Sequence, residues 1–199
     1  MLFLNISSDK VHITDGIQEQ FLDRNGIENV LWPVLVQWYR ERPWSQIFVL
    51  NGPGWFTNLR VGVLSLNLLT TLLGWDLQMF TCTKIHLYKY LIKKWFLPVH
   101  GLVYLGQKKN IWKLVMQGRD FSIQQIVLDD ICTKEDYFLD YVNDESYRKN
   151  NESMISFTVK EHNLTLSCRG KSLIITPQDL GLLPVREIKA EYLMEATIN

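Results

Sequence analysis

The sequence predicts an α/β protein that begins with a short antiparallel meander and continues with alternating helices and strands. Three observations lead to this prediction. The dipeptide Asp15-Gly16 separates two strand-like runs, apolar residues recur at helical spacing in residues 27–39, and a buried-strand pattern at 46–50 leads into a glycine-rich turn. Hydrophobic residues make up 47% of the 199 residues, which is enough to bury a substantial core.

The first three strands are predicted from short apolar runs and the turns that bound them. Residues 2–7 alternate loosely and end in a polar turn. Residues 10–14 and 17–22 flank Asp15-Gly16, which supplies the positive φ angles of a two-residue hairpin turn. We therefore expect three antiparallel strands in a meander.

Two helices are predicted after the meander. The first covers residues 27–39, ends before Pro43, and contains Pro33, which either kinks it or marks a late first turn. The second covers residues 57–73 and is apolar on more than one face. A helix of this kind must be covered on most sides, so we expect it to contact its own sheet and a second surface, such as another chain.

The second half of the chain is predicted mainly as strands. A strand at 77–81 precedes a third helix at 84–96, whose polar face carries Lys84, Lys89, Lys93 and Lys94. We expect this face to be solvated, with contact to phosphates as the alternative. Residues 134–149 favour a helix followed by a loop, while residues 121–131 fit either a strand or the start of a helix. The remaining predicted strands are 99–105, 111–116, 155–160, 164–168 and 173–176.

The predicted order of elements before the third helix is β-β-β-α-β-α-β. It is the order of the ribonuclease-H-like lobe in the superfold of actin, sugar kinases and heat-shock ATPases. The sequence therefore predicts a first ribonuclease-H-like lobe at residues 1–98 and a shortened second lobe at residues 99–199.

Charge and hydropathy narrow the functional classes. Basic and acidic residues both number 21, so the formal net charge is zero and no general attraction to nucleic acid is expected. The most apolar stretch, residues 59–73, is too polar and too short to span a membrane, and residues 1–8 lack the features of a signal peptide. The three isolated cysteines fit reduced thiols, so we expect a cytoplasmic protein; they are Cys82, Cys132 and Cys168.

The loop after the fourth predicted strand resembles a known motif. Residues 52–62 read Gly-Pro-Gly-Trp-Phe-Thr-Asn-Leu-Arg-Val-Gly, and the signature loop of the TsaB family is typically Gly-Pro-Gly-Ser-Phe-Thr-Gly-Leu-Arg-Ile-Gly. We expect the glycines to allow a sharp turn, Thr57 to cap the helix that follows, and Arg60 to reach back over the loop. A helix N-terminus after glycines can also bind an anion. The eight matching positions are Gly52, Pro53, Gly54, Phe56, Thr57, Leu59, Arg60 and Gly62.

Weaker similarities and several departures accompany the loop. The opening residues 1–8, the tripeptide Leu31-Trp32-Pro33 and the segment 189–193 are similar to the family's first strand, first helix and closing segment. The departures remove side chains that relatives carry: Ser7 stands in place of an aspartate, Ile27 of a histidine, Asn58 of a glycine, and Gln107 and Asn110 of an Arg and Glu.

The resemblance implies a non-catalytic helper subunit of the machinery that makes threonylcarbamoyladenosine on tRNA. It implies pairing with a TsaD-type catalytic subunit through the first two helices, with a TsaE-type ATPase as a further partner. No cofactor of its own is expected, ATP and metal belonging to the partner complex, and tRNA would be contacted only indirectly. The predicted interface residues are Leu31, Pro33, Trp38, Leu64 and Leu68.

Other functions stay open at this stage. The four histidines lack the spacing of a helical metal site, yet an enzyme with its own nucleotide or metal site remains an alternative, as does a divergent interaction module. A homodimer through the first-lobe helices is also open. Direct RNA recognition is a further alternative, suggested by Trp75, Trp95 and Trp112 near lysine-rich segments and weakened by the neutral net charge.

Overall fold

A computed structural model places the chain as an α/β protein with three sheets and three α-helices. The residues that the structure describes are 1–54, 56–72, 77–104, 111–117, 120–126, 137–140 and 153–191. None of the helices in these ranges combines the length and the apolarity needed to cross a membrane.

The first sheet contains five strands in the order β3-β2-β1-β4-β5. The central strand β1 pairs antiparallel with β2 and parallel with β4, and β4 pairs parallel with β5. This arrangement confirms the predicted antiparallel meander, and it adds two parallel strands to it. The bounds are β1 Leu2–Asn5, β2 Val11–Thr14, β3 Glu19–Leu22, β4 Gln46–Leu50 and β5 Gln78–Cys82.

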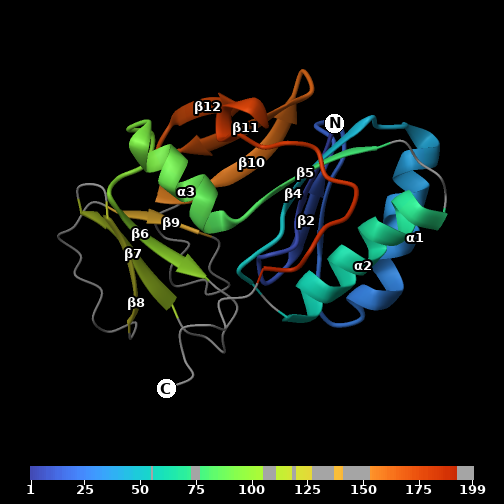
Figure 1. The fold of residues 1–199 in the computed structure, drawn as a ribbon, viewed down its shortest axis with the longest axis horizontal. Coiled ribbons are helices and arrows are strands. Elements are labelled where there is room, and N and C mark those ends of the chain that lie inside the picture. Colours follow the sequence, from blue (N-terminus) through green and yellow to red (C-terminus); the bar gives the residue numbers. More distant parts are fainter. Residues whose placement is uncertain are drawn as a thin grey trace.

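Helices cover both faces of this sheet (Figure 1). Helices α1, Ile27–Glu41, and α2, Phe56–Leu72, lie together on one side, and α3, Lys84–Lys93, lies on the other side with the two smaller sheets. Alternating side chains of β1 explain this arrangement: Leu2 and Leu4 pack toward α1 and α2, whereas Phe3 packs with the second half of the chain.

The predicted two-residue turn at Asp15-Gly16 is wrong, because the hairpin loop contains residues 15–18. The strands pair from Thr14 and Glu19, and the Asp15 backbone N–H donates to the carbonyl of Gln18. The Asp15 carboxylate accepts from the backbone N–H groups of Ile17 and Gln18, at 2.9 Å and 2.7 Å. An aspartate that bonds the next backbone groups favours this wider turn, so β3 starts later than predicted.

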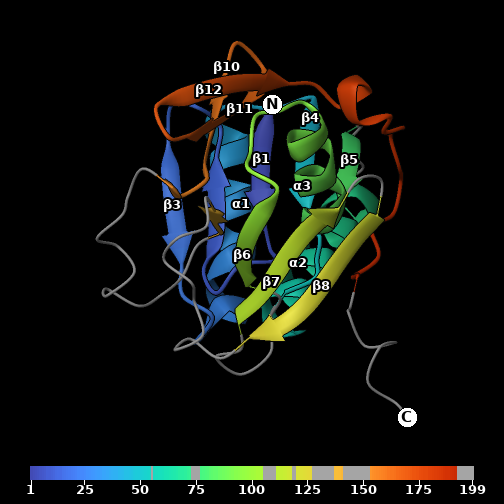
Figure 2. The ribbon, with the colours of Figure 1, turned by 90° about the vertical axis from the view of Figure 1, so that its left-hand side faces the viewer.

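Two smaller sheets follow (Figure 2). One has the order β8-β7-β6-β9, with β6 and β9 parallel and the other pairs antiparallel; the other is the antiparallel set β10-β11-β12. Their bounds are β6 His100–Tyr104, β7 Ile111–Gln117, β8 Asp120–Ile126, β9 Tyr137–Leu139, β10 Ser156–Lys160, β11 Asn163–Cys168 and β12 Lys171–Ile175.

Three helix predictions change. The helix predicted at 134–149 is wrong at Tyr137–Leu139, because this apolar tripeptide pairs with β6 as a strand; the rest of that range, apart from Asp140, lies outside the described residues. Helix α3 ends at Lys93 instead of residue 96, since Trp95 has a left-handed φ of 57°. Pro33 lies inside α1, which removes the alternative that it marks a late first turn.

The last described segment, residues 182–191, returns to the first sheet, and we call it the C-terminal strap. Val185 pairs with Met79 of β5, the Ile188 backbone N–H donates to the Asn67 carboxamide at 2.9 Å, and Glu191 donates to the Asn51 carbonyl at 3.1 Å. The strap therefore joins the first half of the chain after the second half is built.

One core cluster contains residues from both predicted lobes. Phe3, Phe48 and Tyr88 share it with Phe138 and Phe157, and the rings of Phe3 and Phe157 stack with centroids 5.1 Å apart. This core contains residues from both sides of position 98. The division into lobes at residues 1–98 and 99–199 therefore stays a prediction.

Candidate functional site

The signature-like loop lies between β4 and α2, at the carboxyl end of β4. Its backbone is tied to neighbouring elements, since Lys84 N–H donates to the Gly52 carbonyl at 2.7 Å and Asn51 N–H donates to the Cys82 carbonyl at 3.1 Å. The Asn51 side chain donates to the Lys189 carbonyl of the C-terminal strap at 2.7 Å. The loop is thus fixed from β5, from α3 and from the strap.

The glycines of the motif are required by close packing. A Cβ atom on Gly54 would overlap the Ser7 backbone, and one on Gly52, whose φ is 142°, would overlap the Glu191 carbonyl. A Cβ atom on Gly62 would lie 2.5 Å from Cγ2 of Ile6. The motif therefore lets α2 and the loop approach β1 and the strap at backbone distance.

The turn after β1 is closed by neutral side chains. The Asn5 carboxamide oxygen accepts from the Ser7 N–H at 3.0 Å and from the Ser7 hydroxyl at 2.7 Å, while its nitrogen donates to the Ser8 hydroxyl at 3.0 Å. The Asn58 nitrogen donates to the carbonyls of Ser8 and Asp9, both at 2.9 Å, and Asn58 is fully buried. Asn58, noted in the sequence only as a departure, ties α2 to this turn.

The structure bears on the roles predicted for Thr57 and Arg60. Helix α2 begins at Phe56, so Thr57 is its second residue and the predicted cap at Thr57 is wrong. Arg60 reaches back by one helical turn, with its guanidinium carbon 5.0 Å from the centroid of the Phe56 ring. Leu59 is fully buried and packs in the core beneath α2.

The outward face of α2 is apolar. Phe56, Leu64 and Leu72 are exposed by 51%, 62% and 68%, in a helix that carries Arg60 as its single charged residue. A groove of about 500 Å³ runs along this face. It is lined by Phe56, Thr57, Arg60, Val61, Leu64 and, from the C-terminal strap, Ala190.

The predicted interface residues divide into two groups. Leu64 and Pro33 are exposed and Leu68 is half-buried, so these three are accessible on the folded chain. Leu31 and Trp38 are buried in the core between α1 and the first sheet, at 0% and 7% exposure. Their selection as contact residues is wrong, because the apolar face of an amphipathic helix packs inward first.

Lys84 departs from the predicted solvated basic face of α3. Its ammonium group forms an ion pair with the Asp140 carboxylate at 2.5 Å, and both side chains are buried. Burial raises the pKa of the adjacent Tyr88 hydroxyl well above its usual value, and the Asp140 charge adds to this effect. No local sequence pattern indicates this pair, because its members are 56 positions apart.

A second hollow, of about 220 Å³, lies between β1–β3 and the second half of the chain. His12 stacks on Phe21 with centroids 4.3 Å apart, and its Nε2 lies 2.8 Å from the Glu19 carboxylate. Burial lowers the pKa of His12, and the hydrogen bond to Glu19 opposes this effect. The hollow is smaller than the roughly 300 Å³ lower bound of typical small-molecule pockets.

The described residues contain no group of three or more His, Cys, Asp or Glu side chains placed to hold a metal ion. Cys82 and Cys168 are buried free thiols, and burial raises the pKa of Cys82 to about 12. Cys132, Gln107 and Asn110 lie outside the described residues.

Comparison with known proteins gives similarity at the level of structure. No family model and no curated protein matches the sequence. YeaZ from Pseudomonas aeruginosa matches with 14% identity and a TM-score of 0.44, over 90% of this chain and 88% of that one. An uncharacterised protein from the same organism, described as similar to the peptidase YeaZ, matches with 14% identity and a TM-score of 0.43, over 90% and 87%.

YeaZ belongs to the TsaB family, the family that the loop of this chain resembles. A likeness at this identity and TM-score carries no inference about activity or partners.

Proposed function

We propose that this chain is a divergent, TsaB-like helper subunit of the machinery that makes threonylcarbamoyladenosine on tRNA. In this proposal the chain is non-catalytic, and the outward face of α2, with the exposed Pro33 of α1, binds a TsaD-type catalytic subunit. The first sheet and its helices form the ribonuclease-H-like lobe of the proposal, which the strand order 3-2-1-4-5 supports.

The apolar outward face of α2 is the observation that carries the proposal. Scattered exposed apolar residues are common on proteins, but Phe56 and Leu64 line one groove, and this grouping is typical of interaction surfaces. The glycines of the loop support the same proposal indirectly, since they seat α2 on β1 and so fix which side of the helix faces outward.

Cofactors and location follow from the same proposal. ATP and metal are assigned to the partner complex, a TsaE-type ATPase is a further partner, and the cytoplasm is the proposed location. The neutral turn after β1 fits a chain without its own phosphate chemistry, because Asn5, Ser7 and Ser8 satisfy one another.

The test is chromatography with light scattering on the chain, alone and mixed with the TsaD-type protein of the same organism. We expect a one-to-one complex with the unaltered chain. Leu64→Arg should abolish it, because an unpaired charge in an apolar interface costs about 3–5 kcal/mol. Since Leu64 is 62% exposed, the variant should fold normally.

Ile174→Arg is the matched control. Ile174 is 59% exposed on β12, away from α2, so the same change there should leave the complex intact. Absence of a complex with the unaltered, folded chain would reject the helper-subunit proposal. Equal binding by Leu64→Arg would keep the partner and reject this interface.

A further inference from the structure

Trp95 has the combination of exposure and backbone geometry that marks a functional aromatic residue. It is 85% exposed, the largest exposure of any large hydrophobic residue that the structure describes. Its φ of 57° lies in the left-handed region, which a bulky residue rarely adopts and which glycine occupies at the ends of helices. A bulky ring held outward in this conformation suggests use by a ligand.

The end of α3 holds this conformation in place. The Trp95 N–H donates to the Ile92 carbonyl at 2.9 Å, and the Phe96 N–H donates to the Leu91 carbonyl at 3.0 Å. Leu97, two residues further, is buried in the core. The backbone on both sides of Trp95 is therefore anchored, and the indole ring is presented on a rigid support.

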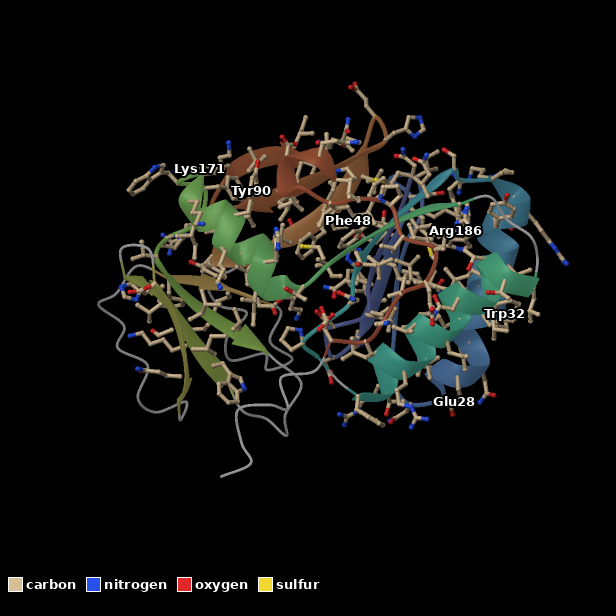
Figure 3. All side chains as sticks on the ribbon, in the orientation of Figure 1. Glu28, Trp32, Phe48, Tyr90, Lys171 and Arg186 are labelled. Carbon is tan, nitrogen blue, oxygen red and sulfur yellow. The ribbon has the colours of Figure 1, made fainter. Side chains whose placement is uncertain are left out.

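Basic residues accompany Trp95 in the chain and in the fold. Lys93, the last residue of α3, and Lys94 directly precede it in the chain, and Arg169 and Lys171, which lie on either side of Gly170 between β11 and β12, line the same hollow as Trp95. In Figure 3 the labelled Tyr90 belongs to α3 and the labelled Lys171 is the first residue of β12. A hollow of about 500 Å³ joins these segments and is lined by Trp95, Phe96, Pro98, His100, Arg169 and Lys171.

The charge of this patch is local and positive. Asp179 is an acid near Lys94, since the Lys94 charge contributes to lowering the pKa of its carboxyl, after the hydrogen bonds from Thr176. The Arg169 guanidinium donates to the Tyr137 carbonyl and to the Ser153 hydroxyl, and these hydrogen bonds hold it in the lining of the hollow. Lys93 and Lys171 are exposed, so the patch is cationic on a chain whose formal net charge is zero.

We infer that the surface formed by Trp95, Lys93, Lys94, Arg169 and Lys171 binds an unpaired segment of nucleic acid, with a base stacked on the Trp95 ring. Sequence-tolerant single-strand binding combines a basic surface with aromatic rings on which bases stack. This surface brings both together. Duplex cannot use the ring, because its bases are already stacked.

The other two tryptophans suggested by the sequence do not join this surface. Trp112 is half-buried and packs against the core, and Trp75 lies outside the described residues. The inference is independent of the TsaD-type partner, because α3 and α2 lie on opposite sides of the molecule (Figure 1).

Trp95→Gly gives a sharp test. Glycine favours the left-handed φ, so the variant should unfold at the same temperature as the unaltered chain or higher, while the ring is lost. Fluorescence anisotropy would use labelled single strands of about 12 nucleotides at about 50 mM salt. We expect Trp95→Gly to weaken binding at least about fivefold, the lower end for loss of one base stack, and Trp95→Phe to bind nearly as the unaltered chain does.

The lysines have a separate readout. Lys171→Gln should reduce the slope of log affinity against log salt by about 0.7, the value for one phosphate contact with a single strand, whereas Trp95→Gly should leave that slope unchanged. The same measurement with single-stranded RNA and with single-stranded DNA identifies the kind of nucleic acid. Tighter binding of RNA assigns the surface to RNA, and equal affinity shows that it accepts both.

Three results would overturn the inference. They are no binding of single strands by the unaltered chain, equal binding by Trp95→Gly, and equal binding of a duplex. If strands do not bind and Trp95→Gly instead loses a protein complex in chromatography, the surface belongs to a protein partner. Leu64→Arg should bind single strands normally, so failure of the partner proposal leaves this test intact.

Discussion

At the scale of single residues, steric requirements explain the glycines of the loop motif. Gly52, Gly54 and Gly62 each stand where a Cβ atom would overlap a neighbour. The sequence alone indicated a sharp turn at the first two. It could not show the reason for Gly62, which depends on Ile6, a residue that follows β1 and lies 56 positions earlier in the chain.

Gly62→Ala tests this explanation. The added Cβ would lie 2.5 Å from Cγ2 of Ile6, so we expect a loss of about 1–3 kcal/mol in the free energy of unfolding. Chemical denaturation would measure it. Combining Gly62→Ala with Ile6→Ala should cost less than the sum of the two single changes, and strict additivity would contradict the proposed contact.

His12 gives a second prediction at this scale, on pH. Burial lowers its pKa below the ordinary 6.5, so as pH falls the unfolded chain takes up the proton before the folded chain does. The free energy of unfolding should therefore fall below about pH 6.5, by at most about 1.4 kcal/mol per pH unit from this residue, until folded His12 is also protonated.

Urea unfolding at about pH 7.5 and about pH 5.5 would check the sign. His12→Gln should lose less stability between the two conditions than the unaltered chain, because it has no proton to bind. The same loss in both proteins would show that His12 does not contribute to the pH dependence.

At the scale of elements, periodicity predicted most of the first sheet and both of its helices. Apolar spacing located α1, β4 and α2 to within a few residues. The errors occur where a side chain or a distant strand decides the local structure. Asp15 widens its turn by bonding the next backbone groups, and β9 forms from three residues that have a partner only in β6.

The Lys84–Asp140 ion pair joins two elements, α3 and the end of β9, and supplies the third prediction. Asp140→Asn should lower the free energy of unfolding by about 3–5 kcal/mol, because it leaves the Lys84 charge buried without a charged partner. The double variant Lys84→Met/Asp140→Leu should recover most of this loss.

A double-mutant cycle by chemical denaturation measures the coupling. Lys89→Gln is the control on the same helix, where an exposed side chain should contribute less than about 0.5 kcal/mol. If Asp140→Asn matched this control, the buried pair would not join the two elements.

At the scale of the whole molecule, sequence order predicted the α/β class but not how the halves meet. The core that contains Phe3, Phe48 and Tyr88 is completed by Phe138 and Phe157, which are far apart in the chain. Local sequence patterns cannot show such contacts, since the apolar pattern of a strand is the same whichever part of the chain packs against it. The sequence could not separate the exposed Leu64 from the buried Leu31 and Trp38 in the predicted interface for the same reason, because an apolar residue looks alike in the sequence whether it is covered or not.

The C-terminal strap has a consequence for synthesis on the ribosome. Strand β5 is an edge of the first sheet, and the side of Met79 that faces away from β4 is paired only when Val185 has been made. Until then a nascent chain that has already formed the meander, α1 and α2 exposes an open edge to neighbouring chains. Vectorial synthesis therefore delays closure of the first-built part by more than a hundred residues, a period in which a holding chaperone would reduce aggregation.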